Sequence, residues 1–253
     1  MMRKSILVFA LLLFSAVGVM AQTPERPPMK PEMTEIWDPE VPVVTPGETP
    51  VDAPSDAIVL FDGTDLSREW TSQDGGKPQW IVEDGAVTVK RGTGVIKTKR
   101  VFEDFQLHIE WRSPSEVVGE SQGRGNSGVF LQERYEVQVL DNYNNRTYRN
   151  GQAGSLYKQY APQVNACKAP GEWQTYDIIY TAPRFNDDGT YFTPPVVTVL
   201  HNGVLVQNNV KLRGPTEYIG IPEYTVTEHG PGSIMLQDHG NPVSFRNIWI
   251  REL

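Results

Sequence analysis

Polar side chains alternate with apolar ones along the segment 135–141, Tyr-Glu-Val-Gln-Val-Leu-Asp. In an extended strand the two valines point into a core, so Glu136 and Gln138 share the opposite face. Strict alternation would place Asp141 on the core side, and a one-residue bulge near Leu140 would return it to the face of Glu136. Aromatic residues flank this row, which favours a functional cleft over a solvated strand face. We therefore predict that Glu136 and Asp141 are catalytic, as a general acid or base, and that Gln138 binds substrate.

A histidine and an arginine near the end of the chain are further candidates. His239 follows a predicted strand and precedes Gly240-Asn241-Pro242, a turn that would expose the imidazole ring. Such a histidine can serve as an acid or base in catalysis, or it can simply bond to the loop backbone. Arg246 could anchor a sugar hydroxyl or carbonyl, or pair with Glu136. We predict that Arg246 and His239 reach the face of Glu136, which requires the last strand to lie in the same sheet.

Three glycines punctuate the segment 123–128, Gly-Arg-Gly-Asn-Ser-Gly. Glycine lets the backbone approach a ligand closely, so Arg124 and Asn126 are candidate substrate-binding residues. A phosphate-cradling loop would lead into a helix, whereas an apolar strand pattern follows here, which argues against nucleotide binding. Lys158 supplies a cation that could enter the same cleft.

The scaffold for these residues is predicted to be a set of short strands. Apolar and polar side chains alternate over 104–112, which is typical of a half-buried antiparallel strand. Glu-Asp-Gly at 83–85 and His-Asn-Gly at 201–203 separate apolar runs and predict hairpins. Further strands are predicted near 126–132, 134–141, 172–181, 232–237 and 243–252. No stretch keeps helical spacing for three turns. Residues 56–253 are therefore predicted to form an all-β, two-sheet antiparallel sandwich of the jelly-roll type.

The charge balance and the cysteine content exclude several classes of protein. The 253 residues include 31 acidic and 23 basic side chains, for a net charge of −8. Such an acidic chain lacks the basic surface that binds a phosphate backbone, so we expect no nucleic-acid partner. Cys167 is the only cysteine. An intrachain disulfide and a zinc site of cysteine pairs are both ruled out.

The N-terminal region has two distinct compositions. Residues 1–21 combine a basic start with an apolar run and small residues before Gln22, the pattern of a cleaved secretory signal peptide. We therefore expect a secreted or periplasmic protein without a membrane span in its mature chain. Residues 22–55 include nine prolines, which favour extended chain. This segment is predicted to be a tether, either a disordered spacer or an arm packed along the domain.

Several of these segments, taken in order, resemble one family. A more limited resemblance concerns the spacing Glu-x-Gln-x-x-Asp, which is similar to the Glu-x-Asp-x-x-Glu row of laminarinase-type glycoside hydrolases. The second and third residues of that row differ here, which puts hydrolysis by two carboxylates in doubt. The closer resemblance extends over about 56–253 and rests on Phe61–Leu66 with Trp70, Trp80–Gly85, Asn126–Leu131, Tyr135–Asp141, Gly171–Gln174, His201–Val204, Leu236–Gly240 and Phe245–Ile248. In this order the segments resemble the secreted 3-keto-disaccharide hydrolase domains, also described as 3-keto-glucoside lyase/hydratase domains.

The resemblance implies a concanavalin-like jelly roll that cleaves the glycosidic bond of a 3-keto-glycoside. A ketone at C3 acidifies the hydrogen at C2, so β-elimination followed by hydration would give net hydrolysis. Glu136 or His239 could be the base, and Arg246, Lys158 or a divalent metal could stabilise the enolate oxygen. No His-x-His spacing points to a catalytic metal, so no cofactor is assigned, although calcium on loop carboxylates such as Asp141 stays open. The competing hypothesis is a noncatalytic, lectin-like carbohydrate-binding module.

Overall fold

Strands make up nearly all of the regular structure in the computed structural model, which describes residues 28–221 and 228–253. The predicted signal peptide, 1–21, lies outside the described residues. Within the described residues, helical structure consists of short 3-10 turns: η1 (Pro31–Thr34), η2 (Leu66–Arg68), η3 (Ser121–Gly123) and η4 (Arg149–Gly151). Over these same residues, no helix has the length and apolar character needed to span a bilayer.

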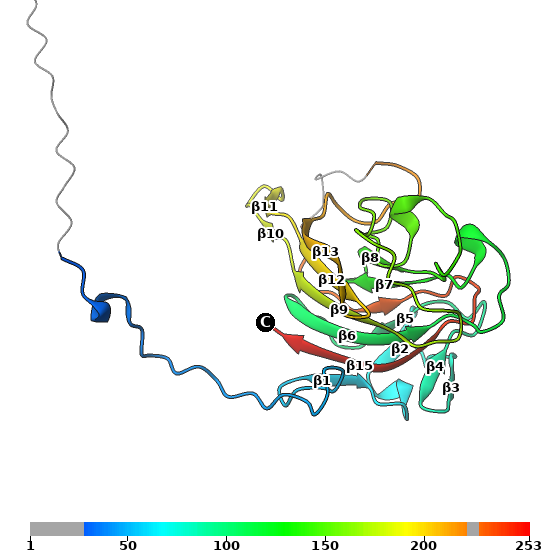
Figure 1. Cartoon of the computed structure of the whole chain (residues 1–253), viewed down its shortest axis with the longest axis horizontal. Helices are drawn as coiled ribbons and strands as arrows, with labels where there is room; N and C mark the ends of the chain where they lie inside the picture. Colours follow the sequence, from blue (N-terminus) through cyan, green and yellow to red (C-terminus); the bar gives the residue numbers. More distant parts are fainter. Residues whose placement is uncertain (1–27, 222–227) are drawn as a thin grey trace, which may run out of the picture. The chain divides into compact units, whose positions relative to one another are not determined.

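The larger sheet follows the order β13-β12-β9-β6-β15-β4-β3, with β1 also paired to β15 (Figure 1). Its strands are β1 (Ile58–Phe61), β3 (Ile81–Glu83), β4 (Ala86–Thr88), β6 (Phe105–Arg112), β9 (Gln174–Thr181), β12 (Val196–His201), β13 (Val204–Lys211) and β15 (Ser244–Glu252). The two predicted hairpins are confirmed as β3–β4 and β12–β13. Asp84 and Asn202 adopt the positive φ that such tight turns require.

The smaller sheet follows the order β2-β5-β14-β7-β8. Its strands are β2 (Trp70–Ser72), β5 (Ile96–Thr98), β7 (Ser127–Leu131), β8 (Tyr135–Val139) and β14 (Met235–Leu236). A separate hairpin joins β10 (Arg184–Phe185) to β11 (Tyr191–Thr193). All the strand pairs are antiparallel, so the predicted two-sheet antiparallel sandwich is confirmed.

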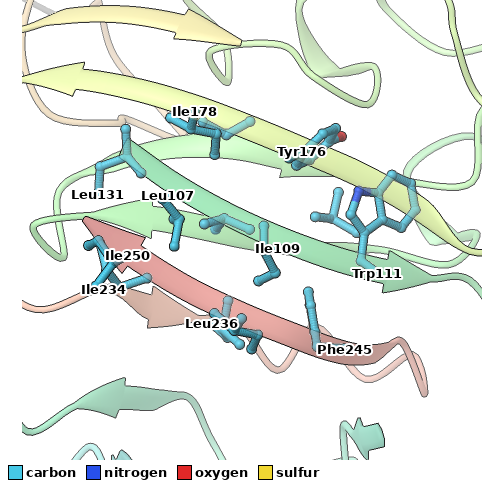
Figure 2. Packing of buried hydrophobic residues seen from close by; sticks show 14 of the residues in the cluster. Leu107, Ile109, Trp111, Leu131, Tyr176, Ile178, Ile234, Leu236, Phe245 and Ile250 are labelled. Atoms are coloured by element: carbon cyan, nitrogen blue, oxygen red, sulfur yellow. The ribbon is translucent and has the colours of Figure 1, made fainter. Parts of the chain in front are cut away.

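Side chains from both sheets form the core (Figure 2). Leu107, Ile109 and Trp111 of β6 lie beside residues of β9 and β15, and the smaller sheet contributes Leu131 and Leu236. All five side chains are fully buried, as the period-two alternation requires. The core therefore fixes which face of each strand points away from it.

The alternating pattern of 104–112 predicted that one face of this strand would be exposed to solvent, but the outer face of β6 is also buried. His108 and Glu110 point away from the core, yet they are 0% and 6% exposed. The ring of Trp249 stacks on His108 with centroids 5.2 Å apart, and Arg246 pairs with Glu110. Neighbouring residues of β15 therefore cover this face of the sheet.

The proline-rich segment divides within its length, because the chain splits into the units Met1–Val43 and Val44–Leu253. The second unit thus begins before residue 56, where the domain was predicted to start. Within it, the carbonyl oxygen of Val51 accepts hydrogen bonds from Asn247 Nδ2 and Trp249 Nε1, both at 2.9 Å. Residues 44–55 therefore behave as an arm on the larger sheet.

Candidate active site

The outer face of the smaller sheet carries two rows of side chains. Strand pairing places Glu136 beside Phe130 and Gln138 beside Gly128. Gln237 extends the second row, since its backbone N–H donates to the Gly128 carbonyl oxygen at 3.0 Å. Because the intervening residues of β8 are in the core, the shared outward direction of Glu136 and Gln138 is as predicted.

A cavity of about 340 Å³ lies over these rows, at the lower end of the usual range for small-molecule sites, about 300–1,000 Å³. It brings together four of the predicted site residues, Glu136, Gln138, Asn126 and His239. The remaining lining residues are Phe130, Tyr157, Thr216, Tyr218 and Gln237. Walls that combine polar side chains with aromatic rings suit a ligand that has both hydroxyl groups and an apolar face.

Glu136 is held in a space left by a glycine. A Cβ atom on Gly128 would lie 2.5 Å from Glu136 Oε1, so only glycine accommodates the carboxylate there. The Glu136 side chain is 5% exposed, and burial raises the pKa of its carboxyl to about 8. A carboxyl group with that pKa exchanges its proton near neutral pH, as a general acid or base must.

The Gln138 amide lies between Glu136 and Gln122. In one orientation its nitrogen donates to Glu136 Oε1 at 2.9 Å and to the Ser127 carbonyl oxygen at 3.1 Å. In the other orientation it donates to Gln122 Oε1 at 3.0 Å. With the amide in the first orientation, Gln138 is a hydrogen-bond donor to the Glu136 carboxyl group.

Two further amides face the cavity. Asn126 is anchored through Nδ2, which donates to the Gln122 carbonyl oxygen at 2.7 Å. Gln237 Oε1 is buried and has no hydrogen-bond partner within the described residues. Gln237 nevertheless contributes to the cavity wall, so the site has a third amide side chain beside Asn126 and Gln138.

His239 reaches the same cavity from the loop after β14. The Gly240 N–H donates to Asp238 Oδ1 at 2.9 Å and closes the turn. The ring is exposed, in agreement with the expected turn at 240–242. His239 and Glu136 therefore line one cavity, although they come from different segments.

Asp141 does not lie beside Glu136, so its predicted place is wrong, and the substrate-binding candidate Arg124 lies with Asp141 outside the main cavity. The alternation does break after Val139, because Leu140 is also in the core. Asp141 Oδ2 then pairs with Arg124 Nε at 2.7 Å, and both residues line a separate cavity of about 100 Å³. The chain has already left β8 at this point, so the strand no longer directs the side chain.

Arg246 is also wrongly placed by the sequence pattern. The prediction required the last strand to join the sheet of Glu136, but β15 belongs to the larger sheet. Arg246 Nε pairs with Glu110 Oε2 at 2.7 Å, and its guanidinium carbon lies 4.2 Å from the centroid of the Trp173 ring. Alternation cannot distinguish one sheet of a sandwich from the other.

Lys158 lies beside the cavity. Its Nζ donates to the Tyr218 carbonyl oxygen at 2.7 Å, next to the cavity-lining rings of Tyr157 and Tyr218.

Over residues 28–221 and 228–253, no three His, Cys, Asp or Glu side chains are arranged to hold a metal ion. Calcium at Asp141 stays a prediction.

Sequence reasoning did not select four of the lining residues, Phe130, Thr216, Tyr218 and Gln237. Gln237 precedes Asp238 and His239 in the same motif, and its position after β14 was the available signal. Thr216 and Tyr218 lie in the irregular segment after β13, where no periodicity directs a side chain. The Glu136 N–H donates to Thr216 Oγ1 at 2.9 Å, which attaches this segment to β8.

Comparisons with known proteins show what this chain is similar to. A model of the 3-keto-alpha-glucoside-1,2-lyase-like domain matches residues 56–251. The 3-keto-disaccharide hydrolase of Bacteroides thetaiotaomicron is 26% identical over 246 residues, covering 81% of each chain. A crystal structure from Parabacteroides distasonis, provisionally described as a glycosyl hydrolase, is 57% identical with a TM-score of 0.84, covering 89% of this chain and 97% of that one. A second from that organism, with the same description, shares the fold at 22% identity and a TM-score of 0.56, covering 78% and 94%.

Proposed function

Because this chain belongs to the 3-keto-alpha-glucoside-1,2-lyase-like domain family, we propose that it cleaves the glycosidic bond of 3-keto-glycosides. At the coarser level it is a glycoside-hydrolase-like carbohydrate enzyme. The observation that carries the finer proposal is Glu136, a buried carboxyl with a pKa of about 8 on the wall of a polar cavity. Ordinary glycoside hydrolysis uses two facing carboxyl groups, whereas the other polar groups of this cavity are amides, hydroxyls and an imidazole.

The proposed reaction proceeds by elimination and then hydration. A base removes the hydrogen at C2, which the ketone at C3 acidifies, and the electron pair forms an enolate. The C1–O bond then breaks as the C1–C2 double bond forms, and an acid gives a proton to the departing oxygen. Water adds its oxygen to C1 and a proton to C2. The products are the free 3-keto sugar and an alcohol, which equals net hydrolysis.

Two residues are candidates for the proton transfers. Glu136 and His239 line one cavity, so one can act as the base at C2 and the other as the acid at the leaving oxygen. The amide groups of Asn126, Gln138 and Gln237 can bind the sugar hydroxyls. An amide N–H that faces the C3 oxygen would stabilise the negative charge of the enolate.

The test uses the 3-keto and ordinary forms of one disaccharide, with the released sugar measured. We expect cleavage of the 3-keto form only, and incorporation of deuterium from D₂O at C2 of the product. Equal cleavage of both forms without deuterium at C2 would indicate ordinary glycoside hydrolysis. Binding of the sugar without cleavage would support the lectin-like alternative.

A further inference from the structure

The cavity differs in chemistry between its inner wall and its mouth. Gln138 and Glu136, on the sheet, are 1% and 5% exposed, whereas Tyr218 is 68% exposed. Tyr157 and Tyr218 both line the cavity. The ring of Tyr218 is not packed in the core, so it is available to contact a ligand at the edge of the cavity.

Lys158 lies against three tyrosine rings, of which Tyr157 and Tyr218 line the cavity and Tyr148 lies beside them. The Tyr148 and Tyr157 hydroxyl groups form a hydrogen bond of 2.6 Å. Lys158 Nζ lies 4.6 Å from the ring centroid of Tyr218, 5.7 Å from that of Tyr148 and 6.0 Å from that of Tyr157. We call Tyr148, Tyr157 and Tyr218 the tyrosine rim. The Lys158 ammonium group interacts with the faces of their rings.

The backbone of Lys158 is held in an unusual conformation. Its φ is +59°, in the left-handed region that residues other than glycine adopt rarely. Asn150 holds it from both sides, because Lys158 N–H donates to the Asn150 carbonyl oxygen at 2.7 Å and Asn150 Nδ2 donates to the Lys158 carbonyl oxygen at 3.0 Å. These two hydrogen bonds hold the backbone of Lys158 in this conformation and so fix the direction in which its side chain leaves the chain.

We propose that the tyrosine rim is the subsite for the leaving group on C1, and that Lys158 is a positioning residue for Tyr218. This inference rests on the proposed function. The buried polar wall suits the 3-keto ring, whose hydroxyl and carbonyl groups need hydrogen-bond partners. The exposed aromatic mouth suits a leaving group that presents a flat apolar face, either an aryl ring or the C–H face of a second pyranose.

The test compares benzyl and methyl 3-keto-glucosides, whose alcohols are of similar acidity. The benzyl-to-methyl ratio of kcat/KM therefore reports contacts to the leaving group. Tyr218→Ala should lower this ratio about tenfold, the equivalent of one stacking contact, and Tyr218→Phe should keep it. Lys158→Ala should lower the ratio mainly through KM for the benzyl substrate, and Lys158→Arg should restore it. Phe192→Ala removes an aromatic side chain that is 72% exposed and outside the cavity, and should change nothing.

An unchanged ratio in Tyr218→Ala would overturn the subsite. A disaccharide whose leaving group is glucose tests whether the subsite also binds a pyranose. A similar fall of its kcat/KM in Tyr218→Ala would extend the subsite to a pyranose, and an unchanged kcat/KM would restrict the subsite to aryl groups. If the wild-type protein cleaves no 3-keto-glycoside, the proposed function fails but the subsite is still tested by calorimetry with the ordinary benzyl and methyl glucosides. Tighter binding of the benzyl compound, lost in Tyr218→Ala, supports the subsite, and equal binding of both compounds refutes it.

Discussion

At the scale of single residues, the position of Glu136 is unusual. The described residues place no cation within ion-pair distance of its buried carboxyl. Burial of an unpaired carboxyl disfavours its charged form and weakens the fold at pH values where it ionises. Such a residue is expected where function, not stability, decides its identity.

The first prediction concerns turnover by Glu136→Gln. The substitution keeps the volume of the side chain and removes its proton exchange, so turnover should fall by roughly 100-fold or more. If Glu136 is the base, wild-type kcat/KM rises with pH through about 8, and if it is the acid, kcat/KM falls through that value. In Glu136→Gln, this rise or fall should be absent from the measured pH profile of kcat/KM. Near-normal turnover would remove Glu136 from the mechanism and leave His239 as the acid–base group.

The second prediction concerns the stability of the same variant. The pKa of Glu136 is about 8 when folded, above its ordinary 4.5, so the unfolded chain releases this proton first as pH rises. Wild-type stability should therefore decline between about pH 4.5 and 8 relative to Glu136→Gln. At about 1.4 kcal/mol per pKa unit, the variant should be more stable by roughly 4–5 kcal/mol at pH 8 and nearly equal at pH 4.5. Denaturant melts at both pH values measure this.

The control for that experiment is Glu83→Gln, which removes a carboxyl from an exposed position on β3. Its free energy of unfolding should differ from the wild type by a similar small amount at both pH values. If Glu136→Gln behaves in the same way as this control, the carboxyl of Glu136 is ionised in the folded protein at neutral pH.

At the scale of strands, alternation and turn sequences predicted much of the fold. Segments with several full periods, such as 104–112 and 243–252, appear as the long strands β6 and β15. The strands β2 and β5 have three residues each, too few to show a period, and pairing with neighbours alone defines them. Alternation also predicted the outward face of Glu136 but not the sheet of Arg246, because sheet membership depends on contacts distant in sequence.

The third prediction concerns the pairing of β7 with β8 and uses Gly128→Ala. The added Cβ atom would lie 2.5 Å from Glu136 Oε1 and 3.0 Å from Phe130 Cε2, so the carboxyl group must move. Small displacements of a catalytic group reduce rates strongly, and we expect a loss of roughly 10- to 100-fold in kcat with the fold retained. Circular dichroism would check the fold. In Gly123→Ala the new Cβ atom has no other atom within 4 Å, so this control should keep its activity. Full activity of Gly128→Ala would show that this space is not needed.

At the scale of the whole molecule, opposite faces of the sandwich have different coverings. Loops and the tyrosine rim enclose the cavity on the smaller sheet, and residues 44–55 lie on the larger sheet. Alternation cannot predict either covering, because both are irregular segments whose positions depend on tertiary contacts.

The fourth prediction concerns export. The pattern of residues 1–21 predicts cleavage before Gln22 and a protein outside the cytoplasm. Mass spectrometry of the exported protein should therefore find Gln22 at the N-terminus. Retention of Met1 in the exported protein would contradict the signal peptide.

The last prediction concerns residues 44–55 as part of the folded unit, and compares chains that start at Val44 and at Asp56. The shorter chain lacks the Val51 carbonyl oxygen, which accepts from Asn247 and Trp249, and exposes Trp249, otherwise 3% exposed. Lost burial and two lost hydrogen bonds should cost about 2 kcal/mol, or roughly 4–8 °C in Tm. Both chains lack residues 1–43, so the difference in Tm isolates the arm. Both should cleave substrate equally at 20 °C, because the cavity lies on the other sheet. Equal Tm values would show that the arm contributes nothing to stability, and the domain would then begin at residue 56, where the family match begins.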